Sequence, residues 1–578
     1  MKKIFTILGL VAIFGFGHSQ VAQVCETEPY QIANNNVALF HAGAAKGSDG
    51  IWYAWGENHG GATGVKEVNS TNYPNVPAGT TVEYVSGGSR GTNLNELVAL
   101  LDNNTIVSLS DYTPSTTNQL VLQDKATIGL PTGVDSENVT SFYAGLNVIA
   151  IVADGKAYVH DRSSRLTLSQ YSYGDGVRRV NNWGNAVRTQ NGIIIEDFVS
   201  VRGASKNQTD NPATAFIGFT KSGKVYAWGN RIPTVNGAQT NTNFAIDITK
   251  IAEDDATAKP VLVGANYSTG AFDTTSVAAT FYVLFDNGEF YSIGNGSRRQ
   301  LGNFSTPNTN TWQRVRTSNN TNSYADVTYF STGEHDGSVL NYAPVTMILR
   351  DKSLWAFGSN DGGILGIGVN EETGGFNPTI SKFNPGPSIN DDTIYVDLNG
   401  TTEAQTATSV EMGGHISFII RNIGGSAKMS ITGHGSRGSL LGIENSNFYN
   451  AYSTETNMPF TPCTLPTPEN PVCYEPATQG TGIASNHGIT LLQRAGTTNG
   501  NWPMARQSAH TVLESNTKGF VITRITTAEL NNITSPQVGM MVYDTDAKCL
   551  KIHDGKTWKC FDTQGCYIDT NINTDWGN

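Results

Sequence analysis

The sequence predicts an all-β protein: a seven-bladed β-propeller followed by a small, mostly β C-terminal module. Two observations lead to this prediction. The 578 residues include 62 glycines and only 15% charged residues, against roughly 25% in ordinary soluble domains, and this composition favours short strands and many turns. An aromatic strand that ends in glycine also recurs along the chain, and units too small to bury both their faces must stack on one another.

The first 19 residues, MKKIFTILGLVAIFGFGHS, predict a secretory signal peptide that is cleaved after Ser19. They combine a basic start, an apolar stretch and a small-residue end, and the apolar stretch is shorter than the ~20 residues that span a bilayer. No later segment is apolar enough to span a membrane. We therefore expect an exported protein, secreted or held at the outer cell surface, without a transmembrane segment.

The repeat occupies residues 20–445. Its marker is an aromatic strand such as IWYAWGEN at 51–58, KVYAWGN at 224–230 or SLWAFGSN at 353–360. Two weaker strands end at Ser110 and His160, so seven markers stand 50 to 75 residues apart. The five marker glycines are Gly56, Gly229, Gly294, Gly358 and Gly433.

Other short strands precede each marker, and such sheet units suit a closed ring that leaves few exposed edges. We expect Trp55, Trp228 and Phe357 to pack between blades as core residues. Each marker glycine then allows a turn that a Cβ atom would obstruct. Blade one lacks an obvious first strand, and the segment NMPFTPC at 457–463 is a candidate to complete it.

The repeat pattern V-x-G, an apolar run, D-G-x-x-Y-A-W-G-x-N and L-G resembles that of the regulator-of-chromosome-condensation family. GEHDG at 333–337 and GGHISF at 413–418 keep the Gly-then-His turn of that family. The resemblance covers roughly residues 30–445 and implies a seven-bladed propeller. The family includes a nuclear nucleotide-exchange factor and secreted bacterial β-lactamase inhibitors. A signal peptide argues against the exchange role, and no contact residue of the inhibitors can be transferred.

A Pro-rich linker is predicted over residues 446–480, followed by a surface-attachment-like module over 481–578. The module resembles a segment of bacterial surface and fibre proteins in which a K-G-F-x-x-x-R run leads to S-P-x-x-G, Y-D-T-D and D-G-x-x-W. The matching residues are Lys518, Gly519, Arg524, Pro536, Gly539, Tyr543, Asp554, Gly555 and Trp558. The resemblance implies attachment or display, with oligomers as one form of it, and no catalysis.

Six cysteines in an exported chain predict disulfides. In CLKIHDGKTWKC, a two-residue turn at Asp554 and Gly555 would place Cys549 directly opposite Cys560. The pairing of the other four cysteines stays open. We predict no cofactor and no metal site, because the chain has no zinc-type cysteine spacing, no P-loop and no H-E-x-x-H.

One face of the ring is a candidate binding surface, because equivalent loops of all blades emerge on the same side. The loops that follow the markers contain six arginines and no lysine, and arginine suits carboxylate recognition. An alternative is that these arginines bond to carbonyls of neighbouring blades. The candidate residues are Arg162, Arg165, Arg231, Arg298, Arg299, Arg437, His59 and His434.

The function we predict is a cell-surface or extracellular protein-binding scaffold without enzymatic activity. The partner on the arginine face would be an acidic protein or a glycan. Nucleic acid is not expected, because the net charge is −12 and binding to polyanions rests on Lys and Arg that neutralise phosphates. Two alternatives are a carbohydrate-binding or polysaccharide-active surface protein, and a structural fibre or surface-layer component.

Overall fold

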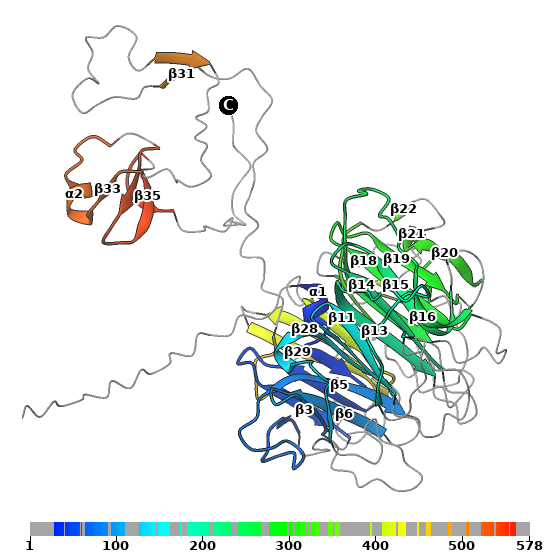
Figure 1. The fold of residues 1–578 in the computed structure, drawn as a ribbon. Helices are drawn as coiled ribbons and strands as arrows, with labels where there is room; N and C mark the ends of the chain where they lie inside the picture. Colours follow the sequence, from blue (N-terminus) through cyan, green and yellow to red (C-terminus); the bar gives the residue numbers. More distant parts are fainter. Residues whose placement is uncertain are drawn as a thin grey trace, which may run out of the picture. The chain divides into compact units, whose positions relative to one another are not determined.

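The computed structural model describes residues 28–561 with gaps, the longest of which cover 110–126, 162–173, 334–344, 359–393, 396–406, 435–447, 464–483, 488–503 and 508–521 (Figure 1). The predicted signal peptide lies outside the described residues. The chain forms two compact units, Met1–Pro466 and Thr467–Asn578, and each is described by itself. Among the described residues, none of the helices has the length and apolar character needed to cross a membrane.

Within the described residues, the first unit is built from seven four-stranded antiparallel sheets, which confirms the all-β propeller. The sheets are β1 (Asn36–Ala38), β2 (Ala42–Lys46), β3 (Trp52–Gly56) and β4 (Lys66–Glu67); β5 (Val82–Arg90), β6 (Leu94–Leu101), β7 (Thr105–Ser108) and β8 (Thr127–Gly129); β9 (Val139–Gly145), β10 (Val148–Ala153), β11 (Lys156–Asp161) and β12 (Asn182–Trp183); β13 (Phe198–Lys206), β14 (Ala213–Thr220), β15 (Val225–Ile232) and β16 (Thr240–Asp247); β17 (Pro260–Tyr267), β18 (Ala279–Phe285), β19 (Phe290–Gly294) and β20 (Thr309–Arg314); β23 (Val327–Gly333), β24 (Val345–Arg350), β25 (Ser353–Gly358) and β26 (Ile394–Tyr395); and β27 (Ser409–Met412), β28 (Ile416–Ile423), β29 (Ser426–His434) and β30 (Phe448–Tyr449). Smaller elements are α1 (Pro29–Ile32), the 3₁₀ turn η2 (Ser136–Asn138) and the pair β21 (Arg316–Ser318) and β22 (Asn322–Ser323).

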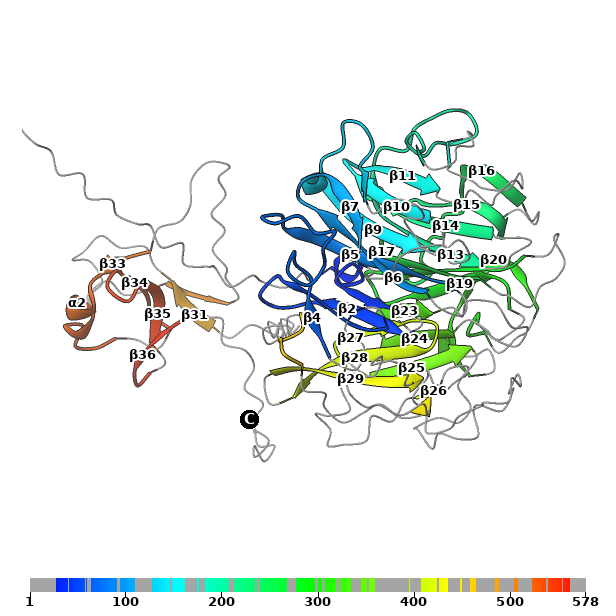
Figure 2. The ribbon, with the colours of Figure 1, turned by 90° about the horizontal axis from the view of Figure 1, so that it is seen from below.

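The sheets are arranged as a ring in which the first strand of each sheet lies innermost. Figure 2 shows β5, β9, β13, β17, β23 and β27 near the centre, with β16, β20 and β26 at the periphery. Each inner strand contacts the inner strand of the next sheet, and β1 contacts β27, so the first and last sheets are neighbours. The two weak markers belong to complete sheets, because β7 and β11 are both third strands.

The core of the ring lies between adjacent sheets rather than within them. Each hydrophobic cluster combines residues of neighbouring sheets; one joins Ala45 and Trp55 of the first sheet to Phe418 of the last. The side chains of Trp55 and Trp228 are fully buried and that of Phe357 is 2% exposed, which confirms their predicted place in the core. Because these rings seal one sheet against the next, they are not available on the surface for stacking on sugars.

The glycine of each marker strand is required by the conformation of its backbone. All five marker glycines have positive φ, from +92° at Gly56 to +123° at Gly294. A Cβ atom at Gly229 would lie 2.3 Å from the carbonyl oxygen of Thr214 on the neighbouring strand. The marker therefore carries glycine at this position because the backbone of the preceding strand lies too close for a Cβ atom.

We expect Gly229→Ala to lower the free energy of unfolding by roughly 3 kcal/mol, because it adds this backbone clash to the cost of an unfavourable φ. Gly79→Ala is the matched control, since Gly79 also has a positive φ, of +83°, but has open space where a Cβ would stand. It should cost about 1 kcal/mol. Scanning calorimetry of both variants measures the difference, and equal losses would contradict the close-approach explanation.

The first sheet differs from the prediction, because it supplies its own inner strand. That strand is β1, from the VALF segment, and the described part of the NMPFTPC segment, residues 458–463, does not replace it. These residues instead pack beside the turn between β2 and β3 of the same sheet. The amide of Cys463 donates to the carbonyl of Lys46 at 3.0 Å, and the ring of Phe460 stacks on Tyr53 with centroids 4.1 Å apart.

The end of the propeller unit therefore lies beyond residue 445. Strand β30 at Phe448–Tyr449 completes the last sheet, and residues 458–463 still belong to the first unit. Polar contacts reinforce this closure: His41 bonds to Glu57 at 3.2 Å and to His415 at 3.1 Å, which links the first sheet to the start of β28.

The second unit contains a hairpin of β31 (Ala484–His487) and β32 (Met504–Gln507), and a four-stranded sheet. The sheet consists of β33 (Arg524–Ile525), β34 (Met541–Asp544), β35 (Cys549–His553) and β36 (Trp558–Cys560), with α2 (Thr527–Asn531) between its first two strands. Thr526 and Glu529 form a capping box that starts α2, in which each side chain satisfies a backbone N–H at the helix start. This reciprocal bonding explains why so short a helix forms at this point of the chain.

The predicted disulfide between Cys549 and Cys560 is present, with Cα atoms 5.7 Å apart. The predicted register is wrong, because Cys560 pairs with Lys551 and His553 with Trp558. The turn therefore spans residues 554–557 instead of Asp554 and Gly555 alone. The two cysteines are diagonal neighbours on one face of the hairpin. The distance between their Cα atoms is still within the range that a disulfide bridges.

Candidate functional site

The arginine face predicted from the sequence is only partly within the described residues. Arg162, Arg165, Arg298, Arg299 and Arg437 lie outside them, and the side chain of His434 at the end of β29 is also not described. Two candidates can be placed. Arg231 is 7% exposed with a φ of +53°, and His59 is fully buried, with its ring beside that of Tyr73. These two residues therefore do not belong to an exposed binding surface.

The inner strands bring a different set of residues together at the centre of the ring. Five of them carry a β-bulge near their first residue, which sets the same register in each strand. The residue four positions after the start of the bulge lies at the centre of the ring in every case. These residues are Ser86, Tyr143, Arg202, Gly264 and Ser331, and all of them line one cavity.

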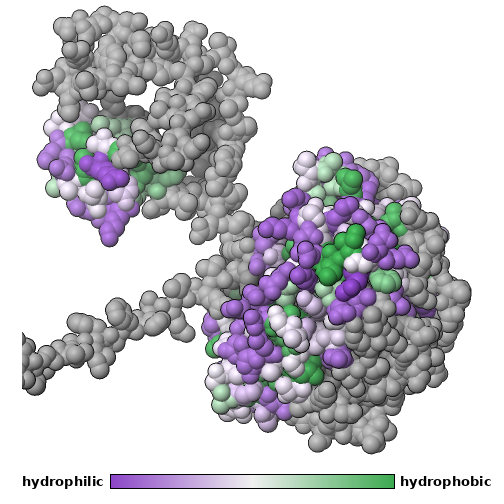
Figure 3. All heavy atoms as spheres, in the orientation of Figure 1, coloured by the Kyte–Doolittle hydropathy of each residue, from purple (hydrophilic) through white to green (hydrophobic). Residues whose placement is uncertain are grey.

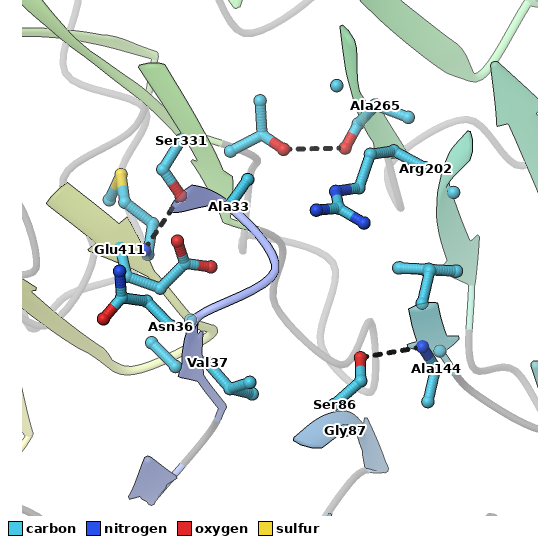
Figure 4. Close-up of a pocket in the computed structure, with 18 of the residues that line it drawn as sticks. Ala33, Asn36, Val37, Ser86, Gly87, Ala144, Arg202, Ala265, Ser331 and Glu411 are labelled. Carbon is cyan, nitrogen blue, oxygen red and sulfur yellow. Dashed lines mark hydrogen bonds between the residues drawn. The ribbon is translucent and has the colours of Figure 1, made fainter. Parts of the chain in front are cut away.

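This central cavity has a volume of about 160 Å³. Its lining includes Arg202 from β13, Tyr329 and Ser331 from β23, and Glu411 from β27. Figure 4 shows Arg202 and Glu411 entering the cavity from opposite sides. Both side chains lie deep in the protein, yet both keep some accessible surface because they face the cavity. They are therefore accessible to a molecule inside the ring.

Burial is the largest cause of the pKa shifts of the ionisable groups at the cavity. Burial raises the pKa of Glu411 to about 8, although the charge of Arg202 and a hydrogen bond with Ser331 oppose that rise. Burial also lowers the pKa of Arg202, which the charge of Glu411 partly offsets. The hydroxyl of Tyr329 has a pKa well above its usual value, first because of burial and then because of Glu411. A buried carboxyl with a raised pKa can donate as well as accept a hydrogen bond near neutral pH.

One end of the cavity is bordered by the segment that follows α1. The side-chain oxygen of Asn34 accepts a 2.7 Å hydrogen bond from Arg202 Nη2, and its amide donates to the carbonyl of Thr140 at 3.0 Å. α1 itself contacts β9 and β17. The N-terminal segment is thus held across inner strands of several sheets and helps to orient the Arg202 guanidinium.

Sequence reasoning missed Arg202 and Glu411 because it treated the inner strands as apolar. The signal was present as a charged residue shortly before the glycine of an inner strand, in SVRG at 200–203 and VEMGG at 410–414. The bulge of β13 then turns Arg202 toward the cavity, whereas Glu411 reaches the same cavity from β27, whose described pairing has no bulge. A cation, a carboxyl group and a phenol around one cavity can bind a small polar molecule.

The sheet of the second unit has one covered face and one exposed face. Val542, Asp544 and His553 on the covered face are buried together with Leu530 of α2, and Lys551 bonds to Asp544 at 2.7 Å. Side chains alternate between the two faces along each strand, and the pairing of the strands brings the residues of the second face side by side. This open face consists of Met541, Tyr543, Leu550, Ile552, Lys559 and Phe561.

The open face is notably apolar for an exposed surface. Met541 is 50% exposed and Phe561 is 65% exposed, and both belong to the larger exposed apolar side chains of the described residues. Figure 3 shows hydrophobic residues in green at the surface of this unit. Adjacent exposed apolar side chains on a sheet commonly mark a contact surface for another protein.

The fold and these surfaces define the class of protein: a β-propeller joined to a C-terminal β module. Within the module, residues 496–575 match the family described as "phage tail like trimerisation region". No curated protein matches the chain.

Three solved structures illustrate the likeness of fold. Human WBSCR16 is 12% identical, with 68% of this chain and 84% of that chain covered and a TM-score of 0.41. Yeast RCC1 (Prp20) bound to Kap60 is 12% identical, with 78% and 92% covered and a TM-score of 0.46. PorZ, a surface component of the type-IX secretion system of Porphyromonas gingivalis, is 9% identical, with 94% and 46% covered and a TM-score of 0.34. At these identities the resemblance is one of fold alone.

Proposed function

We propose that the protein is an exported, non-catalytic scaffold in which the C-terminal module joins three chains and each chain displays a propeller that binds protein partners. The observation that carries this proposal is the open face, which exposes Met541 and Phe561 within the segment that matches a trimerisation family. The sequence-based expectations of a signal peptide and a seven-bladed ring belong to the same proposal.

Burial of the open face supplies a driving force for association. Removing a large apolar side chain such as Phe561 or Met541 from water contributes roughly 1.5–3 kcal/mol. The covered face is already occupied by Leu530 and the Asp544–Lys551 pair, so the open face is the part of this sheet that remains for a second copy. Association of the chains through the open face leaves the propeller units available to bind partners.

Joining three propellers gives multivalent binding. A surface that carries several copies of a partner is bound far longer by three weak sites than by one site. The reason is that the second and third contacts form within a complex that the first contact has already made. Carbohydrate binding is a weaker alternative, since the marker aromatics Trp55 and Trp228 are buried. The arginine loops outside the described residues remain the predicted protein-binding face.

The test of this proposal is the mass of the full chain and of two charge variants, measured by light scattering after size exclusion. Phe561→Glu and Met541→Glu place a carboxylate on the open face, and each should reduce the assembly from three chains to one. Ala528→Glu is the matched control, because Ala528 is exposed on α2 and lies away from that face. The control should keep the native mass.

Two results would contradict the proposal. A native chain that runs as a monomer would remove the trimeric scaffold. An assembly that survives both open-face substitutions would place the contact between chains elsewhere in the molecule. Far-UV circular dichroism on each variant confirms that the chain is folded, so that a change in mass reports association and not unfolding.

A further inference from the structure

The guanidinium of Arg202 has fewer acceptors than a buried cation normally has. Its one short hydrogen bond goes to Asn34 Oδ1 at 2.7 Å, and its contacts with Ser141 Oγ and the Val201 carbonyl are long, at 3.5 Å. Arg202 and Glu411 face each other across the cavity without forming an ion pair within 4.0 Å. Arginine carries five N–H donors, so part of this donor set is directed at the cavity.

A second group at the cavity has no partner at all. Tyr329 is fully buried, lines the cavity and has a hydroxyl group without a hydrogen-bond partner. Leaving a buried hydroxyl unpaired is unfavourable, and such a group in a native protein requires an explanation. Both the hydroxyl and the guanidinium are donors, so the molecule that satisfies them must present acceptors, preferably with negative charge.

We propose that the central cavity binds a small organic monocarboxylate, with Arg202 as its anchoring cation and the Tyr329 hydroxyl as a second donor. The carboxylate accepts hydrogen bonds from the guanidinium in the geometry that arginine and carboxylates share. Glu411 lies opposite, where it can donate to the same anion or to a polar substituent on it. The proposal concerns the propeller unit alone and does not rest on the trimeric function.

The size and lining of the cavity limit the ligand. A volume of about 160 Å³ holds a small molecule of a few heavy atoms. Acetate and propionate fit within this volume. Val37, Leu262 and Phe330 add apolar surface to the lining, which suits a short alkyl group attached to the carboxylate.

The experiment is isothermal titration calorimetry on the full chain with sodium acetate and sodium propionate, at constant ionic strength, with tetramethylammonium chloride as a cationic probe. Arg202→Met removes the cation, and Tyr329→Phe removes only the unpartnered hydroxyl group. Arg188→Met is the matched control, because Arg188 does not line the cavity. Should Arg202→Met fail to fold, Arg202→Lys and Tyr329→Phe decide the outcome.

We expect saturable binding of at least one carboxylate to the native chain and to Arg188→Met. The affinity should be at least tenfold weaker in Arg202→Met and several-fold weaker in Tyr329→Phe. The proposal is overturned by an absence of saturable binding of either carboxylate, by equal affinity in Arg202→Met, or by binding of tetramethylammonium in place of the carboxylates. The first of these results would mean that the cavity holds water only.

Discussion

Replacing Glu289 with alanine is expected to lower the free energy of unfolding by roughly 3–5 kcal/mol, which is the usual cost of breaking a buried ionic network. Glu289 is fully buried and lies in the turn between β18 and β19. It accepts hydrogen bonds from the amides of Glu253 and Asp254 at 2.8 and 2.9 Å and from the Asn287 side chain at 2.6 Å. The Tyr291 hydroxyl also donates to it.

The lowered pKa of Glu289 reflects the hydrogen bonds that these donors make to its carboxylate. Burial by itself would raise the pKa of Glu289, but the hydrogen bonds from Tyr291, Glu253 and Asn287 outweigh it and lower the pKa to about 2. Because the folded pKa is below the ordinary value of 4.5, this stabilisation is complete above pH 4.5 and is lost as the pH falls toward 2. Alanine removes the acceptor and leaves buried donors without a partner.

The matched control for Glu289→Ala is Glu253→Gln. The carboxylate of Glu253 is 54% exposed and pairs with Lys250 at 2.8 Å, so its loss should cost at most about 1 kcal/mol. Urea denaturation of both variants at pH 7 measures the two effects. A loss at Glu289 as small as that at Glu253 would show that the buried network is not a principal support of the fifth sheet.

Glu411→Gln is expected to make the stability of the propeller less dependent on pH between about 5 and 8. The folded pKa of Glu411, about 8, lies above its ordinary value of 4.5 because of burial. The stabilisation from proton binding is therefore complete below pH 4.5 and is lost as the pH rises through 8, with a slope of about 1.4 kcal/mol per pH unit for one such group. Glutamine stays neutral and has no such slope.

The charged and titratable neighbours of Glu411 are Arg202 from β13 and Tyr329 from β23. The measurement is the free energy of unfolding of the native chain and the variant at several pH values from 5 to 9. The difference between the two should grow in favour of Glu411→Gln as the pH rises. A constant difference would mean that the cavity does not shift the titration of Glu411.

The repeat architecture could be predicted because it depends on local chemistry. Marker strands such as that containing Gly229 repeat an aromatic residue before a glycine, and the structure shows a buried ring and a positive φ at these places. The inner strand of the first sheet was missed because VALF is short and lacks the V-x-G pattern. Its identity becomes visible only when β1 contacts β27 around the ring.

The candidate site was harder to predict because it depends on register. Loops after the markers attract attention through their arginines, yet Arg231 turns out to be buried. Arg202 and Glu411 are separated by more than 200 residues in the sequence and converge only because the inner strands meet around the centre of the ring. The Cys549–Cys560 register was also wrong for a simple reason: the length of the turn at 554–557 is not set by Asp554 and Gly555 alone.

The measurement that tests the central claim most directly is sedimentation equilibrium of the unmodified, mature chain over a range of micromolar concentrations. A scaffold joined through the C-terminal module predicts a species of three chains that persists on dilution. A single-chain species throughout the range, with the disulfide between Cys549 and Cys560 intact, would contradict the account. The open face would then have no second copy to cover it.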